Sequence, residues 1–164
     1  MVLLAIPGCQ RPPFPAELAQ KALEAASDEE QELAAVELAQ LASDNEQKPQ
    51  LREEAREHLR RVLAESQSAA VRLACIRGLA SEWDYQSMPV LLDALDDESD
   101  LIRGDAAMAV ERMMSVDLQG FGYQYNDPPA KREAASKRLR AHWEEWRKSE
   151  NYKSWQERLK KKRS

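Results

Sequence analysis

The side chains that could do chemistry in this chain are few and scattered. The two histidines, His58 and His142, fall on different predicted helices and form no metal-binding motif. The acidic run from Asp96 to Asp100 lacks the alternation, the central glycine and the terminal glutamate of a calcium loop. Gly120 and Gly122 stand in the wrong context for a phosphate-binding loop. We therefore expect no catalytic centre, no metal and no cofactor.

The two cysteines stand in different surroundings. Cys75 occupies a small-residue position of a predicted core helix, where a buried, unreactive thiol is expected. Cys9 follows an apolar run that ends in Gly8, and a proline-rich stretch comes after it. This pattern resembles the end of a bacterial lipoprotein signal, in which the cysteine is lipidated. The resemblance implies a signal remnant and tether over residues 1–15, lipidation at Cys9 and anchoring in the cell envelope; the alternative is a cytoplasmic protein.

A helix predicted over residues 99–113 organises the rest of the chain. Its apolar positions form one stripe of mostly small side chains, so a neighbouring helix can approach closely: Ile102, Ala106, Ala109, Val110 and Met113. We expect Ser99 or Asp100 to supply its N-terminal cap. A shift of 31 residues superposes this helix on the segment that starts at Ser68 and includes Arg72 and Cys75. Such a period is typical of solenoids, whose units bury their apolar faces only against each other.

The repeated pattern is a β-branched residue and an arginine followed by small and aliphatic positions, preceded by an acidic turn. It resembles the second helix of HEAT repeats, with the bacterial HEAT-like variety as the nearest match. In that family the equivalent arginine pairs with an acidic turn residue of a neighbouring unit. The resemblance therefore implies a structural role for Arg72 and Arg103, and Arg103 would pair with Asp96 or Asp100.

The remaining periodicity predicts an all-α fold, an α-α superhelix (a HEAT-like solenoid) of about three helical pairs with an aromatic-rich C-terminal cap. The predicted helices span about 16–26, 27–42, 50–65, 69–79, 87–95 and 99–113, followed by 129–148. We divide the chain into a tether (1–15), HEAT-like repeats (16–115), a capping loop and helix (116–149) and a basic C-terminal segment (150–164). Phe121, Tyr123 and Tyr125 are expected to close the end of the stack.

Charge is divided unevenly along the chain. Residues 1–130 have 11 basic and 24 acidic side chains, a net charge of −13, whereas residues 131–164 have 13 basic and 5 acidic, a net charge of +8. An acidic body disfavours broad binding to nucleic acid. We expect Lys160 to Arg163 to form a solvated, disordered tail, with attraction to anionic lipid or an acidic protein as the alternative.

These observations favour a non-enzymatic protein-interaction scaffold. Its partner-binding surface is expected on the concave face lined by the second helices, which includes Arg72, Arg77, Arg103 and Glu111. Two alternatives rest on other proteins with HEAT-like repeats. One is a chromophore-handling protein similar to phycobilin lyases, and the other is a nucleic-acid-binding solenoid similar to alkyl-base glycosylases.

Overall fold

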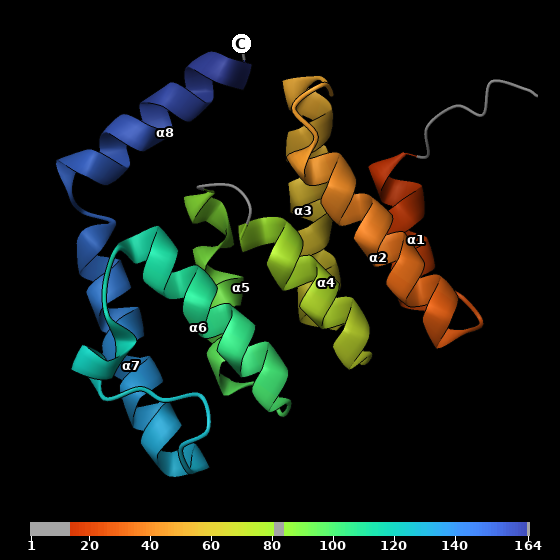
Figure 1. Ribbon diagram of the computed structural model, residues 1–164. Helices are drawn as coiled ribbons and strands as arrows, with labels where there is room; N and C mark the ends of the chain where they lie inside the picture. The colour runs from red at the N-terminus through yellow and green to blue at the C-terminus, as the bar shows by residue number, and fades with distance from the viewer. Residues whose placement is uncertain (1–13, 81–83, 164) are drawn as a thin grey trace, which may run out of the picture.

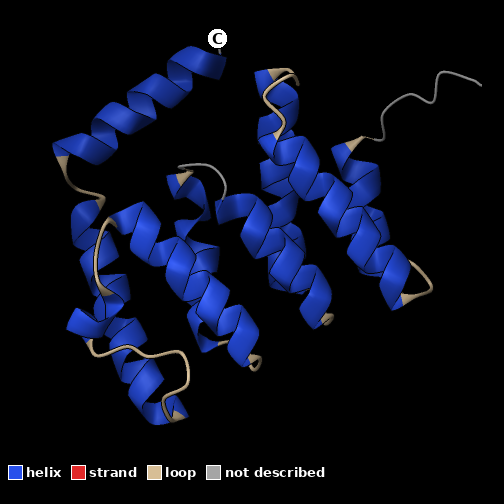
Figure 2. Ribbon diagram, viewed as in Figure 1, coloured by secondary structure: helices blue, strands red, loops and turns tan. Residues whose placement is uncertain are grey.

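The computed structural model describes residues 14–80 and 84–163, which form helices and connecting turns with no strand. The helices of this part are α1 (Pro15–Glu24), α2 (Asp28–Ser43), α3 (Pro49–Glu65), α4 (Ala69–Ala80), α5 (Met88–Asp93), α6 (Asp100–Met114), α7 (Pro129–Trp146) and α8 (Glu150–Arg163). Short 3₁₀ turns η1 (Tyr85–Ser87) and η2 (Ala94–Asp96) flank α5, and η3 (Leu118–Phe121) follows α6. The all-α prediction is confirmed (Figure 2).

The helices form two layers (Figure 1). The pairs α1/α2, α3/α4 and α5/α6 each pack together, and α2, α4 and α6 lie side by side in front of α1, α3 and α5. Helix α7 continues the rear layer by packing against α5 and η2, while α8 turns back along one edge of the molecule to contact α3. This arrangement is the predicted HEAT-like solenoid of three helical pairs.

Small side chains allow the front layer to pack closely. A Cβ atom built on Gly78 of α4 would lie 2.6 Å from the Cβ atom of Ala39 in α2 and 3.0 Å from its Cα atom. Ala35 and Leu38 of α2 are completely buried. Because Ala39 leaves no room for a methyl group at position 78, Gly78 sets the distance between α2 and α4.

The predicted helix ends agree with the structure to within a few residues, but two details differ. At the start of α2, the Ser27 hydroxyl accepts a hydrogen bond from the amide of Glu30, as a capping residue does. At the start of α6, the Ser99 side chain makes no capping bond, and neither Ser99 nor Asp100 supplies the cap oxygen that we expect. Instead, the Asp97 carboxylate accepts a hydrogen bond from the Ser99 amide, so the acidic turn fixes the backbone just before α6.

The basic segment over residues 150–163 is helical. The prediction that Lys160 to Arg163 forms a disordered tail is wrong, because α8 continues to Arg163. Tyr152, Trp155 and Leu159 lie on one side of α8 and are each partly buried, which ties the helix to the rest of the molecule.

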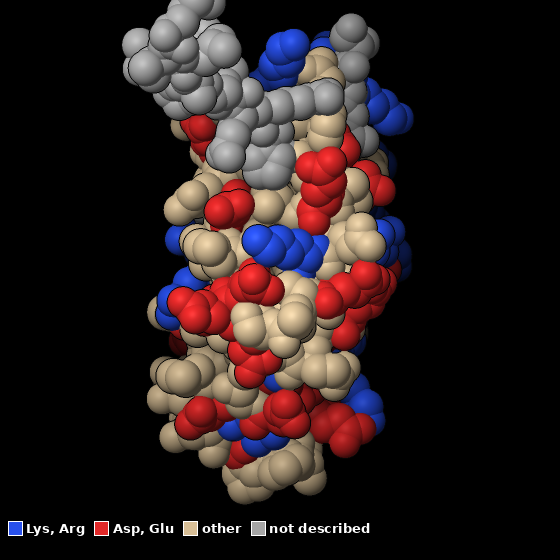
Figure 3. All heavy atoms as spheres, turned by 90° about the vertical axis from the view of Figure 1, so that its right-hand side faces the viewer, with Lys and Arg blue, Asp and Glu red and all other residues tan. Residues whose placement is uncertain are grey.

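Charge is also separated in space. Residues 14–47, which form α1, α2 and the following turn, have nine acidic side chains and a single basic one, Lys21. Figure 3 shows the resulting cluster of carboxylates on the end of the molecule formed by α1 and α2. The basic α7 and α8 lie at the opposite end in Figure 1. None of the described helices is long and apolar enough to cross a membrane.

Candidate functional site

The outward sides of α2, α4 and α6 form one face of the molecule, which we call the second-helix face and which Figure 1 views directly. The 31-residue repeat makes Ala70, Ala74 and Arg77 of α4 equivalent to Leu101, Asp105 and Met108 of α6. The first set lines a hollow of about 300 Å³ between α2 and α4, and the second set lines a hollow of about 650 Å³ on α6. Equivalent positions of successive repeats therefore open two hollows on the same face.

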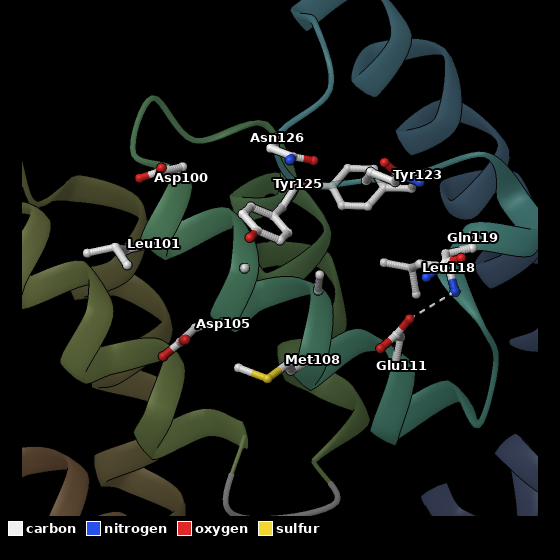
Figure 4. Close-up of a pocket in the computed structure, with 13 residues that line it drawn as sticks. Asp100, Leu101, Asp105, Met108, Glu111, Leu118, Gln119, Tyr123, Tyr125 and Asn126 are labelled. Atoms are coloured by element: carbon white, nitrogen blue, oxygen red, sulfur yellow. Dashed lines mark hydrogen bonds between the residues drawn. The ribbon is translucent and has the colours of Figure 1, made fainter.

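The larger hollow, which we call the α6 groove, lies between α6 and residues 118–126 (Figure 4). Leu101, Met108 and Tyr125 gather around it, and their exposed fractions are 69%, 61% and 47%. They make up three of the five large hydrophobic side chains that are exposed in the described part of the chain. A concave site lined by apolar side chains together with a few polar groups is typical of a binding site. The polar groups here include Asp100, and Glu111 at the other end of the groove.

Gly104 allows the tyrosine to reach the helix. A Cβ atom built on Gly104 would lie 3.9 Å from Cγ of Tyr125, so the tyrosine ring rests over a position that has no side chain of its own. A long side chain at this position would compete with the ring for the same space. Gly104 and Tyr125 together therefore form one part of the groove wall.

Arg103 fixes the loop that carries Tyr125. Its side chain is buried, and its Nε atom donates to the Tyr125 carbonyl at 2.6 Å. Its Nη1 atom donates to the carbonyls of Asp97 and Glu98 at 2.7 and 2.8 Å. The expected pairing of Arg103 with Asp96 or Asp100 is therefore wrong, because three converging carbonyls occupy the guanidinium. Arg103 therefore holds the groove wall in place, and its burial keeps it from contact with a partner.

Two further contacts hold the loop after α6 in place. The amide of Leu118 donates to Oε1 of Glu111 at 3.1 Å, so this carboxylate faces the groove and also orders its far wall. The buried Tyr123 hydroxyl donates to the Leu95 carbonyl at 2.6 Å. Burial, assisted by the nearby carboxylate of Asp96, raises the pKa of Tyr123 to about 12. These contacts make the groove a preformed surface rather than an open loop.

Arg72 joins two repeats. It is buried, and its Nε and Nη2 atoms donate to the two carboxylate oxygens of Asp97 at 2.8 and 3.0 Å. Its Nη2 atom also lies 3.2 Å from Glu98, and its Nη1 atom donates to the carbonyls of Ser66 and Gln67. The hydrogen bond to Asp97 raises the pKa of Arg72. An arginine that clamps the acidic turn of the next unit is the arrangement that the HEAT-like resemblance implies.

Comparison with known proteins decides the family. A family model of HEAT repeats matches residues 56–139, which are 84 of the 164 residues. The chain belongs to the HEAT-repeat family. The matched segment begins within α3 and ends within α7, so it contains both arginines and the α6 groove. No curated protein and no solved structure shows significant similarity to the chain.

Arg77 lies at the surface of this HEAT array. Its side chain is 67% exposed, and its Nε atom donates to Asp105 of the next repeat at 2.7 Å. This ion pair stands between the two hollows of the second-helix face. Of the four residues predicted to bind a partner, Arg77 and Glu111 reach this surface, whereas Arg72 and Arg103 are held inside it.

The aromatic residues of the C-terminal part divide into separate groups. Tyr85, Trp143, Trp146, Tyr152 and Trp155 form one cluster where α7 and α8 meet, with ring centroids of contacting pairs 4.6–6.5 Å apart. The three residues expected to close the stack lie in different places. Tyr123 is buried, Phe121 packs against His142 with centroids 5.1 Å apart, and Tyr125 faces the α6 groove.

Leu101 and Met108 are the site residues that sequence reasoning missed. Both lie in the helix that organises the chain, but outside its buried stripe. Two apolar residues seven positions apart on the solvent side of an otherwise polar surface were the available signal. Tyr125 carried no comparable signal, because its position depends on the path of the loop.

Among the described residues, the cysteine and the possible metal ligands do not form a reactive site. Cys75 is buried, and desolvation raises the pKa of its thiol to about 12, which suppresses the reactive thiolate. The described histidine, cysteine, aspartate and glutamate side chains include no group of three or more that could hold a metal ion. Cys9 lies outside the described residues, so its lipidation stays a prediction.

Proposed function

We propose that this protein is a non-enzymatic interaction scaffold whose α6 groove binds a segment of another protein. HEAT repeats form helical scaffolds that generally serve protein interaction. The observation that carries the proposal is the gathering of Leu101, Met108 and Tyr125 around one preformed groove. Aromatic residues and methionine are enriched at protein interfaces, where they supply contact area to a partner.

The energetics of the groove support this proposal. Burial of a fully exposed leucine or methionine side chain stabilises a complex by roughly 1.5–3 kcal/mol. Leu101 and Met108 are both more than half exposed, so a partner that covers them gains a substantial part of that free energy. Since Arg103, Glu111 and Tyr123 already hold the loop, little ordering is needed when a partner binds.

Photo-crosslinking tests the proposal directly. Benzoylphenylalanine replaces Leu101 in the full chain expressed in its native cell, and a matched protein carries it at Phe14, an exposed phenylalanine that precedes α1 of the rear layer. We expect position 101 to crosslink to one defined segment of one polypeptide, and a Met108→Ser change to abolish that crosslink. The proposal fails if positions 14 and 101 give the same products, or if Met108→Ser leaves the product at position 101 unchanged.

We also propose that Cys9 is lipidated and anchors the scaffold in the cell envelope. The support is the apolar run before Cys9 and the proline-rich stretch after it. A fatty-acid analogue should label the protein produced from its native locus, and a Cys9→Ser variant should lose the label. Equal labelling of both proteins, or no label on either, would refute lipidation. The chromophore-binding and nucleic-acid-binding alternatives stay predictions, and no described contact favours them.

A further inference from the structure

Acidic side chains outnumber basic ones around the two hollows of the second-helix face. The residues that line them include four carboxylates, which are Glu32, Asp100, Asp105 and Glu111, and one cation, Arg77. The α6 groove itself contains three of these carboxylates and no basic residue among the described side chains that line it. A bound segment therefore meets an apolar floor with a negative border.

Two of these carboxylates are available to a partner. Asp100 and Glu32 are exposed, and neither makes a hydrogen bond or an ion pair with another residue in the described part of the chain. Asp105 is paired with Arg77, whose exposed guanidinium can swing away at little cost. A cationic ligand can thus gain new ion pairs at both ends of the face, while the described residues that line the two hollows offer an anionic ligand only Arg77.

The spacing of the helices suggests how such a ligand lies. Neighbouring packed helices are about 8–10 Å apart, so the path from α6 across α4 to α2 is roughly 20 Å long. A helix that rises 1.5 Å per residue covers this distance with about 13 residues. Along this path the groove residues Leu101 and Met108 come first, then the Arg77–Asp105 pair, and Glu32 last.

We infer that the occupant of the α6 groove is a cationic amphipathic helix of a partner protein. Its apolar side chains fill the space between Leu101, Met108 and Tyr125, and its lysine or arginine side chains pair with Asp100 and, farther along, with Glu32. This inference rests on the proposed function and specifies the partner's chemistry. Charge complementarity with the predominantly acidic body would also speed the encounter.

Fluorescence anisotropy with designed peptides tests the inference. Three labelled peptides of about 18 residues are titrated with the full chain. The first has a leucine stripe with lysine elsewhere, the second has the same stripe with glutamate, and the third has the lysine composition with the stripe scrambled. We expect the first peptide to bind at least about tenfold more tightly than the other two.

Variants locate the binding site of the first peptide. Leu101→Ser with Met108→Ser should weaken its binding by about tenfold or more, while Phe14→Ser before α1 should leave it unchanged. Asp100→Asn with Glu32→Gln should weaken it by about threefold to tenfold, and this loss should shrink at high salt. Circular dichroism of each variant confirms that it is folded.

Several results would overturn the inference. Equal binding of the scrambled peptide, stronger binding of the glutamate peptide, or binding that the groove variants leave unchanged would each do so. Concentration-dependent self-association that Met108→Ser abolishes would identify a second copy of this chain as the occupant instead. If no peptide binds but Leu101 still crosslinks to one partner segment, the proposed function stands and the cationic helix is rejected.

Discussion

At the level of single residues, Arg72 and Arg103 occupy equivalent positions of adjacent repeats but bind different acceptors. Arg72 holds the carboxylate of Asp97 in the next repeat, whereas Arg103 holds three backbone carbonyls, including that of Tyr125. The Nη1 atoms of both arginines donate to equivalent carbonyls just before their own helices. The difference arises at Nε, because the loop after α6 supplies the Tyr125 carbonyl where a further repeat would supply an acidic turn. The repeat pattern predicted a structural role for both residues, but it could not predict the acceptors of Arg103.

The clamp formed by Arg72 should contribute strongly to stability. An Arg72→Ala change leaves the Asp97 carboxylate, whose side chain is only 10% exposed, without its cation. We expect a loss of about 3–5 kcal/mol in the free energy of unfolding, measured by urea denaturation. Arg77→Ala, which removes an exposed guanidinium, is the control and should cost about 0–1 kcal/mol. Similar losses for the two variants would contradict the clamp.

Tyr123 should make stability depend on alkaline pH. Its pKa is raised from 10 to about 12 in the folded protein, so the neutral hydroxyl favours the folded state fully below pH 10. That contribution is lost as the pH rises from 10 to 12. The difference in ultraviolet absorbance between the protein and a Tyr123→Phe variant should show one phenol that titrates near pH 12. A midpoint near pH 10 for this difference would disprove the buried hydrogen bond.

At the scale of helices, hydrophobic periodicity predicted the elements of the repeats well. The stripe from Ile102 to Met113 is buried as expected, because helix packing in a solenoid depends mainly on which positions are apolar and small. Helix α8 was not predicted, because partly buried rings attach it to the molecule instead of a buried apolar stripe. None of the side chains described in residues 150–161 is fully buried, and the attachment of the helix depends on the ring of Tyr85, which is distant in sequence, as well as that of Trp146.

Two helical glycines with different amounts of space around them should respond oppositely to alanine. Gly104→Ala places a methyl group at an ordinary contact distance from Tyr125 and should raise the free energy of unfolding by roughly 0.5–1 kcal/mol, since alanine favours the helix. Gly78→Ala forces a methyl group to within 2.6 Å of Ala39 and should lower it by about 1–3 kcal/mol. Thermal denaturation of both variants measures the difference. The packing of α2 on α4 is misassigned if Gly78→Ala is neutral.

At the scale of the whole molecule, the second-helix face and the basic end are independent features. Helix α8 contacts α3, packs its aromatic rings on α7, and approaches α6 at Met113 and Met114. The groove lies elsewhere, along residues 100–111 of α6 and residues 118–126. The separation of charge along the sequence predicted an acidic body and a basic end. The position of the groove on the acidic part could not be predicted, because it depends on how the loop folds back over Gly104.

This independence leads to a prediction about local stability. Trp155→Ala removes the ring that lies 5.2 Å from Tyr85 and 5.3 Å from Tyr152, so α8 should lose its attachment. Hydrogen exchange of residues 150–163 should accelerate, while that of the groove residues 100–111 stays unchanged. Binding of the cationic peptide should also be unaffected. Faster exchange in residues 100–111, or loss of peptide binding, would show that α8 supports the groove.

If a partner binds at the α6 groove, it should protect the backbone amides there, and hydrogen exchange on the complex measures this protection. Exchange is measured by mass spectrometry on the full chain with and without the bound cationic helix, or with the partner segment identified by crosslinking. We predict slower exchange in residues 100–111 and 118–126, with no change in residues 150–163. Protection confined to α8, or to the rear layer of α1, α3 and α5, would contradict the account.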